Sequence, residues 1–192
     1  MDIQDNMKKA VGKLVSLDEP AWARIESCLV PKRLLEGHHI IREGAVARYV
    51  GFVGDGCLRS FYYHDGEEYT VNFFLPGDFF GDCQNFIARD PSTITIQAVE
   101  PSQLLLIPLD DLNQMEEEFP AVESLGKRIT EKHYEHERKR ITSFLSDNAE
   151  KRYLDLLENK PLLIRRTPQH MVASYLGMSP ETLSRVRRHI AQ

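Results

Sequence analysis

Charged side chains near the end of the chain have the types and the spacing of groups that read DNA bases. Glu181, Thr182 and Arg185 would lie on the early turns of a helix, where a recognition helix carries its base-reading side chains. An arginine can donate two hydrogen bonds to O6 and N7 of guanine, and a glutamate can accept one from N4 of cytosine. Glu181 and Arg185 therefore predict contacts with bases in the major groove.

A helix-turn-helix over residues 169–188 would position these side chains. Ala173 is small enough for two helices to cross closely, and Gly177 stands where the chain must turn through left-handed backbone space. Ser179 is a natural N-cap and Pro180 a natural first residue of the second helix. Two amphipathic helices joined at a glycine also occur as ordinary core packing, which is the alternative interpretation. The apolar residues suit two packed helices: Val172, Leu176, Met178, Leu183 and Val186.

The charge of the chain is divided between an acidic part and a basic part. The whole chain has a net charge of −5, which is unusual for a DNA-binding protein. Residues 1–138 contain 14 Lys and Arg against 24 Asp and Glu, a net charge of −10, whereas residues 139–192 contain 10 against 5, a net charge of +5. This asymmetry fits a sensor joined to a reader that neutralises phosphates, although an excess of five charges is modest.

Length and composition indicate an ordinary water-soluble protein. The 192 residues, 42% of them hydrophobic, can form one large domain or two small ones. The sequence has no apolar run of about 18 residues, and its first residues lack the apolar core of a signal peptide, so we expect a cytoplasmic protein. Cys28, Cys57 and Cys83 are widely separated, which predicts free and mostly buried thiols without a zinc site or a disulfide. We expect no cofactor.

Short β-rich runs separated by turn residues fill the part of the chain that follows two predicted N-terminal helices in residues 1–29. Eight runs at this spacing predict a sandwich or a rolled-up barrel. The Asp65-Gly66 pair predicts a hairpin, because this dipeptide suits the type I′ turn. The predicted strands are Val30–Leu35, His39–Arg42, Tyr49–Gly54, Cys57–His64, Glu67–Leu75, Phe79–Cys83, Thr93–Val99 and Gln103–Pro108.

Helical periodicity returns after Pro108. We expect a short helix over Leu109–Phe119, a long one from Ala121 to about Leu145, another over Ala149–Glu158, and a connector over residues 161–168. A helix of some 25 residues is about 37 Å long, which exceeds the width of a small barrel. It is therefore suited to pairing with a second copy of itself, although it could also cover its own barrel, and its polar middle argues against a continuous coiled coil.

This order of elements resembles the Crp/Fnr family of bacterial transcription regulators over nearly the whole chain. The most specific segments are Pro76-Gly77-Asp78-Phe79-Phe80-Gly81-Asp82, which resembles the family's entry into its cyclic-nucleotide pocket, and Ser179-Pro180-Glu181-Thr182-Leu183-Ser184-Arg185, which is similar to its recognition helix. The resemblance implies that Glu181 and Arg185 read bases. It places Gln169, Thr182 and Arg188 near phosphates, with Ser179 and Pro180 at the start of the same DNA-binding helix.

The predicted effector pocket departs from the family members that bind cyclic AMP. In those proteins a Gly-Glu pair and an Arg-Ser or Arg-Thr pair bind the ribose and the cyclic phosphate, whereas the counterparts here are Gly81-Asp82 and Ser92-Thr93. Loss of the arginine removes a charge-assisted, bidentate partner of the phosphate. Arg89, three residues upstream, is a candidate substitute. We therefore predict weak or absent binding of cyclic nucleotides at this pocket.

Two further family features are missing from the sequence. The oxygen-sensing branch binds an iron–sulfur cluster through four cysteines, which three dispersed cysteines cannot supply. Family members also add a two-stranded wing after the recognition helix, whereas this sequence ends shortly after it. We therefore expect fewer phosphate contacts, or DNA binding that depends more strongly on a dimer.

The sequence as a whole predicts an α+β protein that is not an enzyme. We expect a cyclic-nucleotide-binding-like sensor in residues 1–120, an antiparallel, jelly-roll-like β-roll of about eight strands with flanking helices. Residues 121–146 would form a dimerisation helix, and residues 147–192 an all-α helix-turn-helix domain without a wing. The predicted partners are double-stranded DNA and a second copy of the chain, with a small-molecule effector and RNA polymerase as further candidates.

Two other functions compete with this prediction. The chain could be a ligand-binding or protein-docking module whose DNA binding is vestigial, as the missing wing and the missing pocket arginine suggest. A β-roll could also belong to a metal-dependent cupin-type enzyme, which needs converging histidine and carboxylate ligands. His38, His39 and Glu43 are present, but they lack the alternating pattern that would place two imidazoles on one face of a strand, and the two histidines are as well explained as surface residues.

Overall fold

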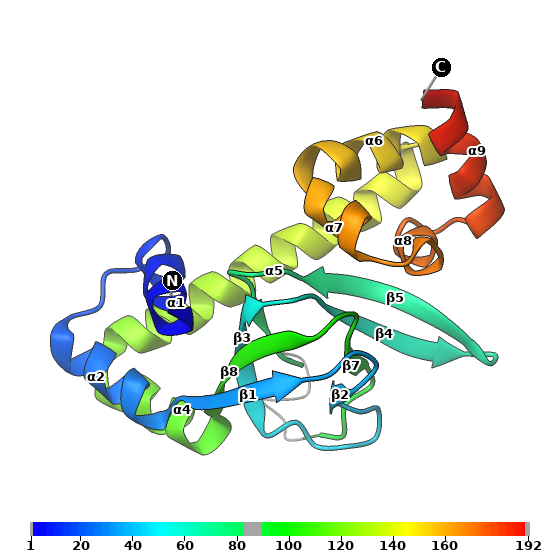
Figure 1. Ribbon diagram of the computed structural model, residues 1–192. Coiled ribbons are helices and arrows are strands. Elements are labelled where there is room, and N and C mark those ends of the chain that lie inside the picture. Colours follow the sequence, from blue (N-terminus) through cyan, green and yellow to red (C-terminus); the bar gives the residue numbers. More distant parts are fainter. Residues whose placement is uncertain (1, 83–89, 191–192) are drawn as a thin grey trace.

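A β-roll forms the centre of the computed structural model, which describes residues 2–82 and 90–190 (Figure 1). Two four-stranded antiparallel sheets have the strand orders β1-β8-β3-β6 and β2-β7-β4-β5. This architecture confirms the predicted α+β fold. Most strands end within two residues of the predicted limits, but β6 is shorter, and Cys83 lies outside the described residues. The strands are β1 Val30–Leu34, β2 His39–Ile41, β3 Tyr49–Asp55, β4 Leu58–His64, β5 Glu67–Phe74, β6 Phe79–Phe80, β7 Thr95–Ala98 and β8 Ser102–Pro108.

The hairpin between β4 and β5 has the predicted turn. Asp65 has a φ of 50° and Gly66 a φ of 80°, so both central residues have the positive φ that a type I′ turn requires. The two strands pair in antiparallel register from His64 opposite Glu67 onward. A β-bulge between Ser60 and Phe61 interrupts this register, and we expect it to increase the local twist of the sheet.

The N-terminal helices cover the outer face of the sheet that contains β3 and β8. Helix α1 spans Ile3–Gly12 and α2 spans Glu19–Cys28, and the side chains of Asp2 and Asp18 cap them. Both helices contribute to a core that also contains buried side chains of β3, β8, α4 and the first turns of α5. A separate core, which includes Val53, Leu58 and Ile96, fills the interior between the two sheets.

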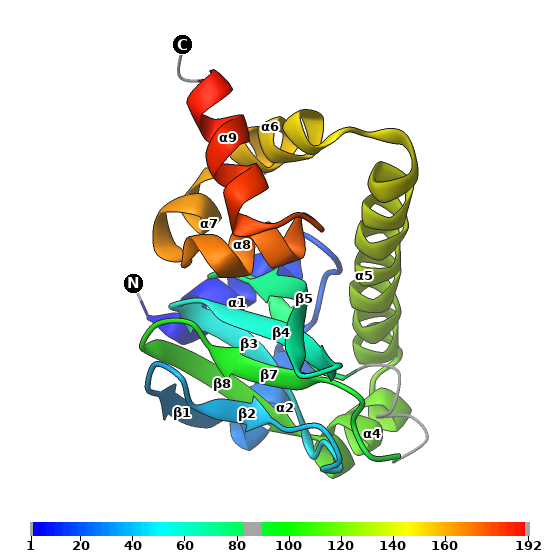
Figure 2. The same cartoon turned by 90° about the vertical axis from the view of Figure 1, so that its right-hand side faces the viewer.

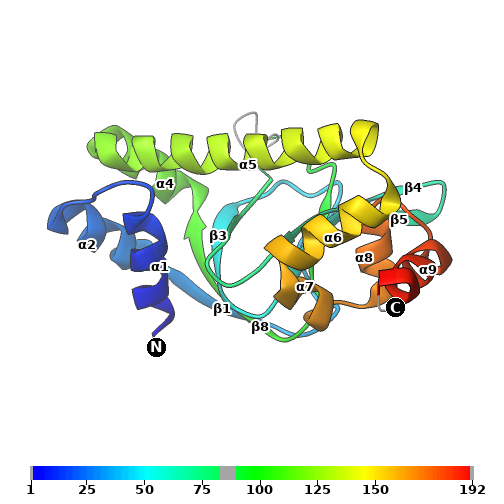
Figure 3. The ribbon, with the colours of Figure 1, turned by 90° about the horizontal axis from the view of Figure 1, so that it is seen from above.

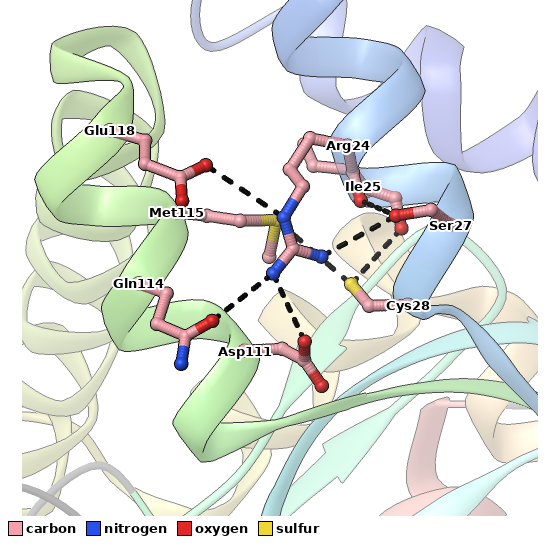
Figure 4. Close-up of polar contacts among 8 residues, drawn as sticks. All are labelled: Arg24, Ile25, Ser27, Cys28, Asp111, Gln114, Met115 and Glu118. Carbon is pink, nitrogen blue, oxygen red and sulfur yellow. Dashed lines mark hydrogen bonds and ion pairs between the residues drawn. The ribbon is translucent and has the colours of Figure 1, made fainter.

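A polar cluster around Arg24 joins α2 to α4, which spans Leu109–Glu118 (Figure 4). The Arg24 guanidinium donates to Asp111 Oδ1 over 3.1 Å and to Gln114 Oε1 over 3.4 Å. Beside it, the Cys28 thiol donates to the carbonyl of Ile25 and lies 3.9 Å from the sulfur of Met115. The predicted free thiols are confirmed for Cys28, which is half-buried, and for Cys57, which is buried.

A long helix and a compact helical domain complete the chain (Figure 2). Helix α5 has 27 residues, Pro120–Ser146, and begins and ends within one residue of the predicted limits, Ala121 and about Leu145. The predicted connector over residues 161–168 is wrong, because Pro161–Arg166 forms α7. Within the described residues, none of the helices is long and apolar enough to cross a membrane. The remaining helices are α6 Ala149–Asn159, α8 Gln169–Tyr175 and α9 Pro180–Ile190.

Candidate nucleic-acid interface

Helices α8 and α9 form the predicted helix-turn-helix. Gly177 has a φ of +61° at the turn, a conformation that glycine adopts without strain. The Thr182 amide donates to Ser179 Oγ over 3.2 Å, so that Ser179 caps the second helix as predicted. Ala173 and Leu183 are fully buried where the two helices pack together. The turn, the cap and the packing of the motif therefore depend on the same residues from which the motif was predicted.

The predicted DNA-binding residues lie on the outer side of this motif. Arg185 Nη2 donates to Thr182 Oγ1 over 3.1 Å, and Ser179 Oγ lies 3.3 Å from the same oxygen. A hydrogen bond from Ser179 lowers the pKa of Glu181, which keeps this carboxylate ionised. Thr182 is half-buried, and six of these residues are exposed: Gln169, Ser179, Pro180, Glu181, Arg185 and Arg188.

The helical domain packs directly on the β-roll, which the sequence does not predict. Ser174 of α8 accepts a hydrogen bond from the Thr70 amide of β5 over 2.9 Å and donates to the Glu68 carbonyl over 3.1 Å. Because β5 is the last strand of its sheet, these bonds satisfy backbone groups that an edge strand otherwise exposes. One core contains Cys57 and Phe73 of the roll together with the buried side chains of α6 to α9. A polar serine in α8 gives no signal of such a distant partner.

Helix α5 binds the same junction through its polar middle. The Arg140 guanidinium donates to the carbonyls of Thr70 and Tyr175 over 3.1 and 2.9 Å. His136 Nε2 lies 3.1 Å from the Tyr175 hydroxyl, and burial lowers the pKa of this imidazole to about 4. Burial also raises the pKa of the Tyr175 hydroxyl to about 12. Polar residues of α5 therefore hold α5, β5 and α8 together.

The turn of the motif touches the same helix. A Cβ atom at Gly177 would lie 2.7 Å from Cε1 of Phe144, which is closer than side-chain atoms approach. The guanidinium of Arg140 lies 4.7 Å from the centre of the Phe144 ring, and that of Arg152 lies 5.4 Å from it. Gly177 is thus needed both for its positive φ and for close packing on α5.

The predicted effector pocket has a serine at the position where the resemblance expects an arginine. Ser92 is buried, and its hydroxyl donates to the Ile94 carbonyl over 2.8 Å and lies 3.2 Å from the Ile94 amide, so its own turn uses it. Asp82 is buried, Gly81 is half-buried and Thr93 is exposed, whereas Arg89 lies outside the described residues. None of these four described residues lines the cavities of about 580, 380 and 290 Å³.

Comparisons with known proteins agree with this organisation. The family model of the cyclic nucleotide-binding domain matches residues 31–119, from β1 to the end of α4. The chain is 25% identical over 167 residues to the transcriptional activator protein Anr of Pseudomonas aeruginosa, covering 80% of this chain and 67% of that protein. It is also 25% identical over 184 residues to the fumarate and nitrate reduction regulatory protein of Vibrio cholerae, covering 89% and 73%.

Among solved structures, FixK2 from Bradyrhizobium japonicum has a similar fold. The TM-score is 0.75 at 21% identity, with 85% of this chain and 84% of that chain covered. The likeness therefore extends from the β-roll into the helical domain.

Proposed function

We propose that this chain, a member of the Crp/Fnr family of transcription regulators, binds operator DNA as a homodimer in the cytoplasm and reads bases with α9. The observation that carries this proposal is the exposed early part of a capped helix, where Glu181 and Arg185 stand free of the protein core. Their chemistry suits cytosine and guanine. Gln169, Thr182 and Arg188 would contact the DNA backbone, which orients a protein without reading sequence.

The replacement Arg185→Ala tests the base-reading assignment. It should weaken binding to the preferred operator by about 1–3 kcal/mol and relax specificity at one base pair, whereas a lost phosphate contact weakens all sequences alike. The operator would first be selected from genomic fragments with the wild-type protein, and affinities then measured by fluorescence anisotropy at fixed salt. Equal binding of operator and random DNA by wild type and variant would refute the assignment.

A matched replacement separates the loss of a base contact from the loss of positive charge. Arg165 is an exposed arginine in α7, away from the predicted reading face. Arg165→Ala should leave the ratio of operator to random-DNA affinity unchanged, even if it shifts both affinities through the net charge.

We further propose that the pocket of the β-roll does not bind cyclic AMP tightly. Support comes from Ser92, whose hydroxyl is already used within its own turn at the position of the missing arginine. Titration calorimetry with cyclic AMP and cyclic GMP should show no binding at low micromolar concentration. Saturable binding in that range would contradict this part of the proposal.

The dimer proposal rests on apolar side chains that α5 leaves uncovered. Tyr134, Ile141 and Leu145 follow one another by seven and four residues, and are 69%, 58% and 85% exposed. Seven- and four-residue steps lie on one stripe of a helix. A second copy of α5 would cover this stripe, and a two-fold pair would present two recognition helices to two half-sites.

A further inference from the structure

A cavity of about 580 Å³ lies between α1, α5 and the turn from β5 to β6, with Lys160 at the end of α6 closing one side. Figure 3 looks down on the helices that border it. Its walls are partly apolar, with Phe73 and Phe74 of the roll. The volume falls in the range of cavities that hold small organic ligands.

The cavity gathers positive charge although the chain as a whole is acidic. Lys9 and Lys13 line it from α1, Lys132 from α5, and Lys160 from the end of α6. Among the lining residues that the structure describes, Asp78 is the one acidic side chain, and one of its oxygens already accepts from the Leu75 amide over 2.9 Å. The cavity is therefore strongly biased toward anions.

Three of these lysines have ammonium groups without a direct partner among the described residues. Those of Lys13, Lys132 and Lys160 make no hydrogen bond or ion pair with another described residue. Lys160 is the most enclosed of them, and burial lowers the pKa of its ammonium group. Lys13 and Lys132 are exposed, so water can solvate their ammonium groups. Lys160 is half-buried, and a bound anion would offset the desolvation of its charge.

The histidines of the cavity do not supply charge but help to shape it. His133 and His136 line it from α5, and burial lowers the pKa of both imidazoles. Their Nε2 atoms lie within hydrogen-bond distance of the Phe79 carbonyl and of the Tyr175 hydroxyl. His136 and Lys160 also line a neighbouring cavity of about 380 Å³ between α5, α6 and α8, so that the two cavities meet at these residues.

We propose that this cavity binds a small organic anion, whose acidic groups contact Lys13, Lys132 and Lys160 and whose apolar body packs against the phenylalanine wall. The site differs from the predicted effector pocket of the roll, because Gly81, Asp82, Ser92 and Thr93 do not line it, although residues 76–79 of the entry segment do. Lysines from three elements converge on it, so that a bound anion would connect the N-terminal helix, α5 and the helical domain. The proposal does not depend on DNA binding.

The test uses 1-naphthyl phosphate, an aromatic dianion that the cavity can hold, in a titration of the full chain followed by ligand-detected NMR. We expect saturable binding with a dissociation constant below about 1 mM. Inorganic phosphate, which lacks the apolar body, and 1-naphthol, which lacks the charge, should each bind roughly tenfold more weakly or not at all.

Variants locate the binding site. Lys13→Gln and Lys132→Gln replace exposed side chains and should leave the fold intact, and each should weaken 1-naphthyl phosphate binding by roughly tenfold. Lys160→Gln should have a similar or larger effect. Lys32→Gln, at an exposed lysine of β1 away from the cavity, should leave affinity within about twofold.

Several results would overturn the proposal. Absence of binding, equal affinity for 1-naphthol, or equal affinity for inorganic phosphate would show that the cavity is not a site for an organic anion. Wild-type affinity in both Lys13→Gln and Lys132→Gln would place the bound molecule elsewhere. Loss of DNA binding in Arg185→Ala has no bearing on these measurements, so the two proposals fail independently.

Discussion

His136 is held neutral inside the chain, although an imidazole ordinarily titrates near neutral pH. Burial is the main cause of its lowered pKa of about 4, and the nearby positive charge of Lys160 adds to it. In the unfolded chain the same imidazole has a pKa of about 6.5. Between these two values the unfolded state takes up a proton that the folded state does not bind. The free energy of unfolding should therefore fall as the pH decreases through this range.

The replacement His136→Gln should remove this contribution while leaving an amide near Tyr175. From about pH 7 to about pH 5, we expect the wild-type protein to lose roughly 1–2 kcal/mol more of its free energy of unfolding than the variant, after allowance for partial solvent contact. Urea titrations at the two pH values measure the difference. The control is His64→Gln, at an exposed imidazole of the β4–β5 hairpin. An equal loss in wild type and His136→Gln would contradict the assignment.

At the scale of elements, the turn between α8 and α9 depends on Gly177 for two separate reasons. Alanine there would adopt a φ of +61° and would bring Cβ to 2.7 Å from the ring of Phe144. We expect Gly177→Ala to lower the free energy of unfolding by about 1–2 kcal/mol because of the left-handed backbone. The contact with the Phe144 ring should lower it further. Thermal and denaturant unfolding measure the total decrease in the free energy of unfolding.

Two comparisons separate these costs. Gly12→Ala is a matched control, since a Cβ at Gly12 meets nothing within 4 Å and its φ is not positive. It should be neutral or slightly stabilising. In a Phe144→Ala background, Gly177→Ala should cost less, because the ring that it contacts is gone. The same cost in both backgrounds would show that α5 does not restrict the turn.

The elements that local patterns specify could be predicted from the sequence, and those that depend on distant partners could not. Strand limits, the Asp65-Gly66 turn and the Ser179 cap follow from neighbouring residues. Helix α7 is not predicted because Pro161 indicates the end of the preceding helix. Proline also suits the first turn of a helix, and Leu163 of α7 is buried. The contact of Ser174 with β5 joins positions more than a hundred residues apart. Local periodicity in the sequence cannot predict such a contact.

At the scale of the whole molecule, the β-roll and the helical domain behave as one packed body. Arg166 of α7 lies 3.2 Å from Glu100 and 3.8 Å from Asp55, so it pairs the basic part of the chain with the acidic part. These ion pairs are partly exposed and contribute little on their own. The shared core around Phe73 stabilises the junction more strongly, because it buries apolar surface of both parts. The position of α9 is therefore fixed relative to the roll and to α5.

In the proposed dimer, a fixed α9 would make the spacing of the two recognition helices depend on how the two copies of α5 pair. The oligomeric state is therefore the decisive measurement. We expect light scattering to give twice the 22.1 kDa of one chain. Ile141→Glu and Leu145→Glu, on the uncovered stripe of α5, should produce monomers, because a dimer would bury an unpaired carboxylate. Leu154→Glu, at a leucine of α6 that is 40% exposed, should remain dimeric. Because half-sites are about 34 Å apart, only a dimer can contact both at once. The monomeric variants should therefore lose operator affinity, although the sequence of α9 is unchanged. A monomeric wild type, or variants that stay dimeric, would refute this arrangement.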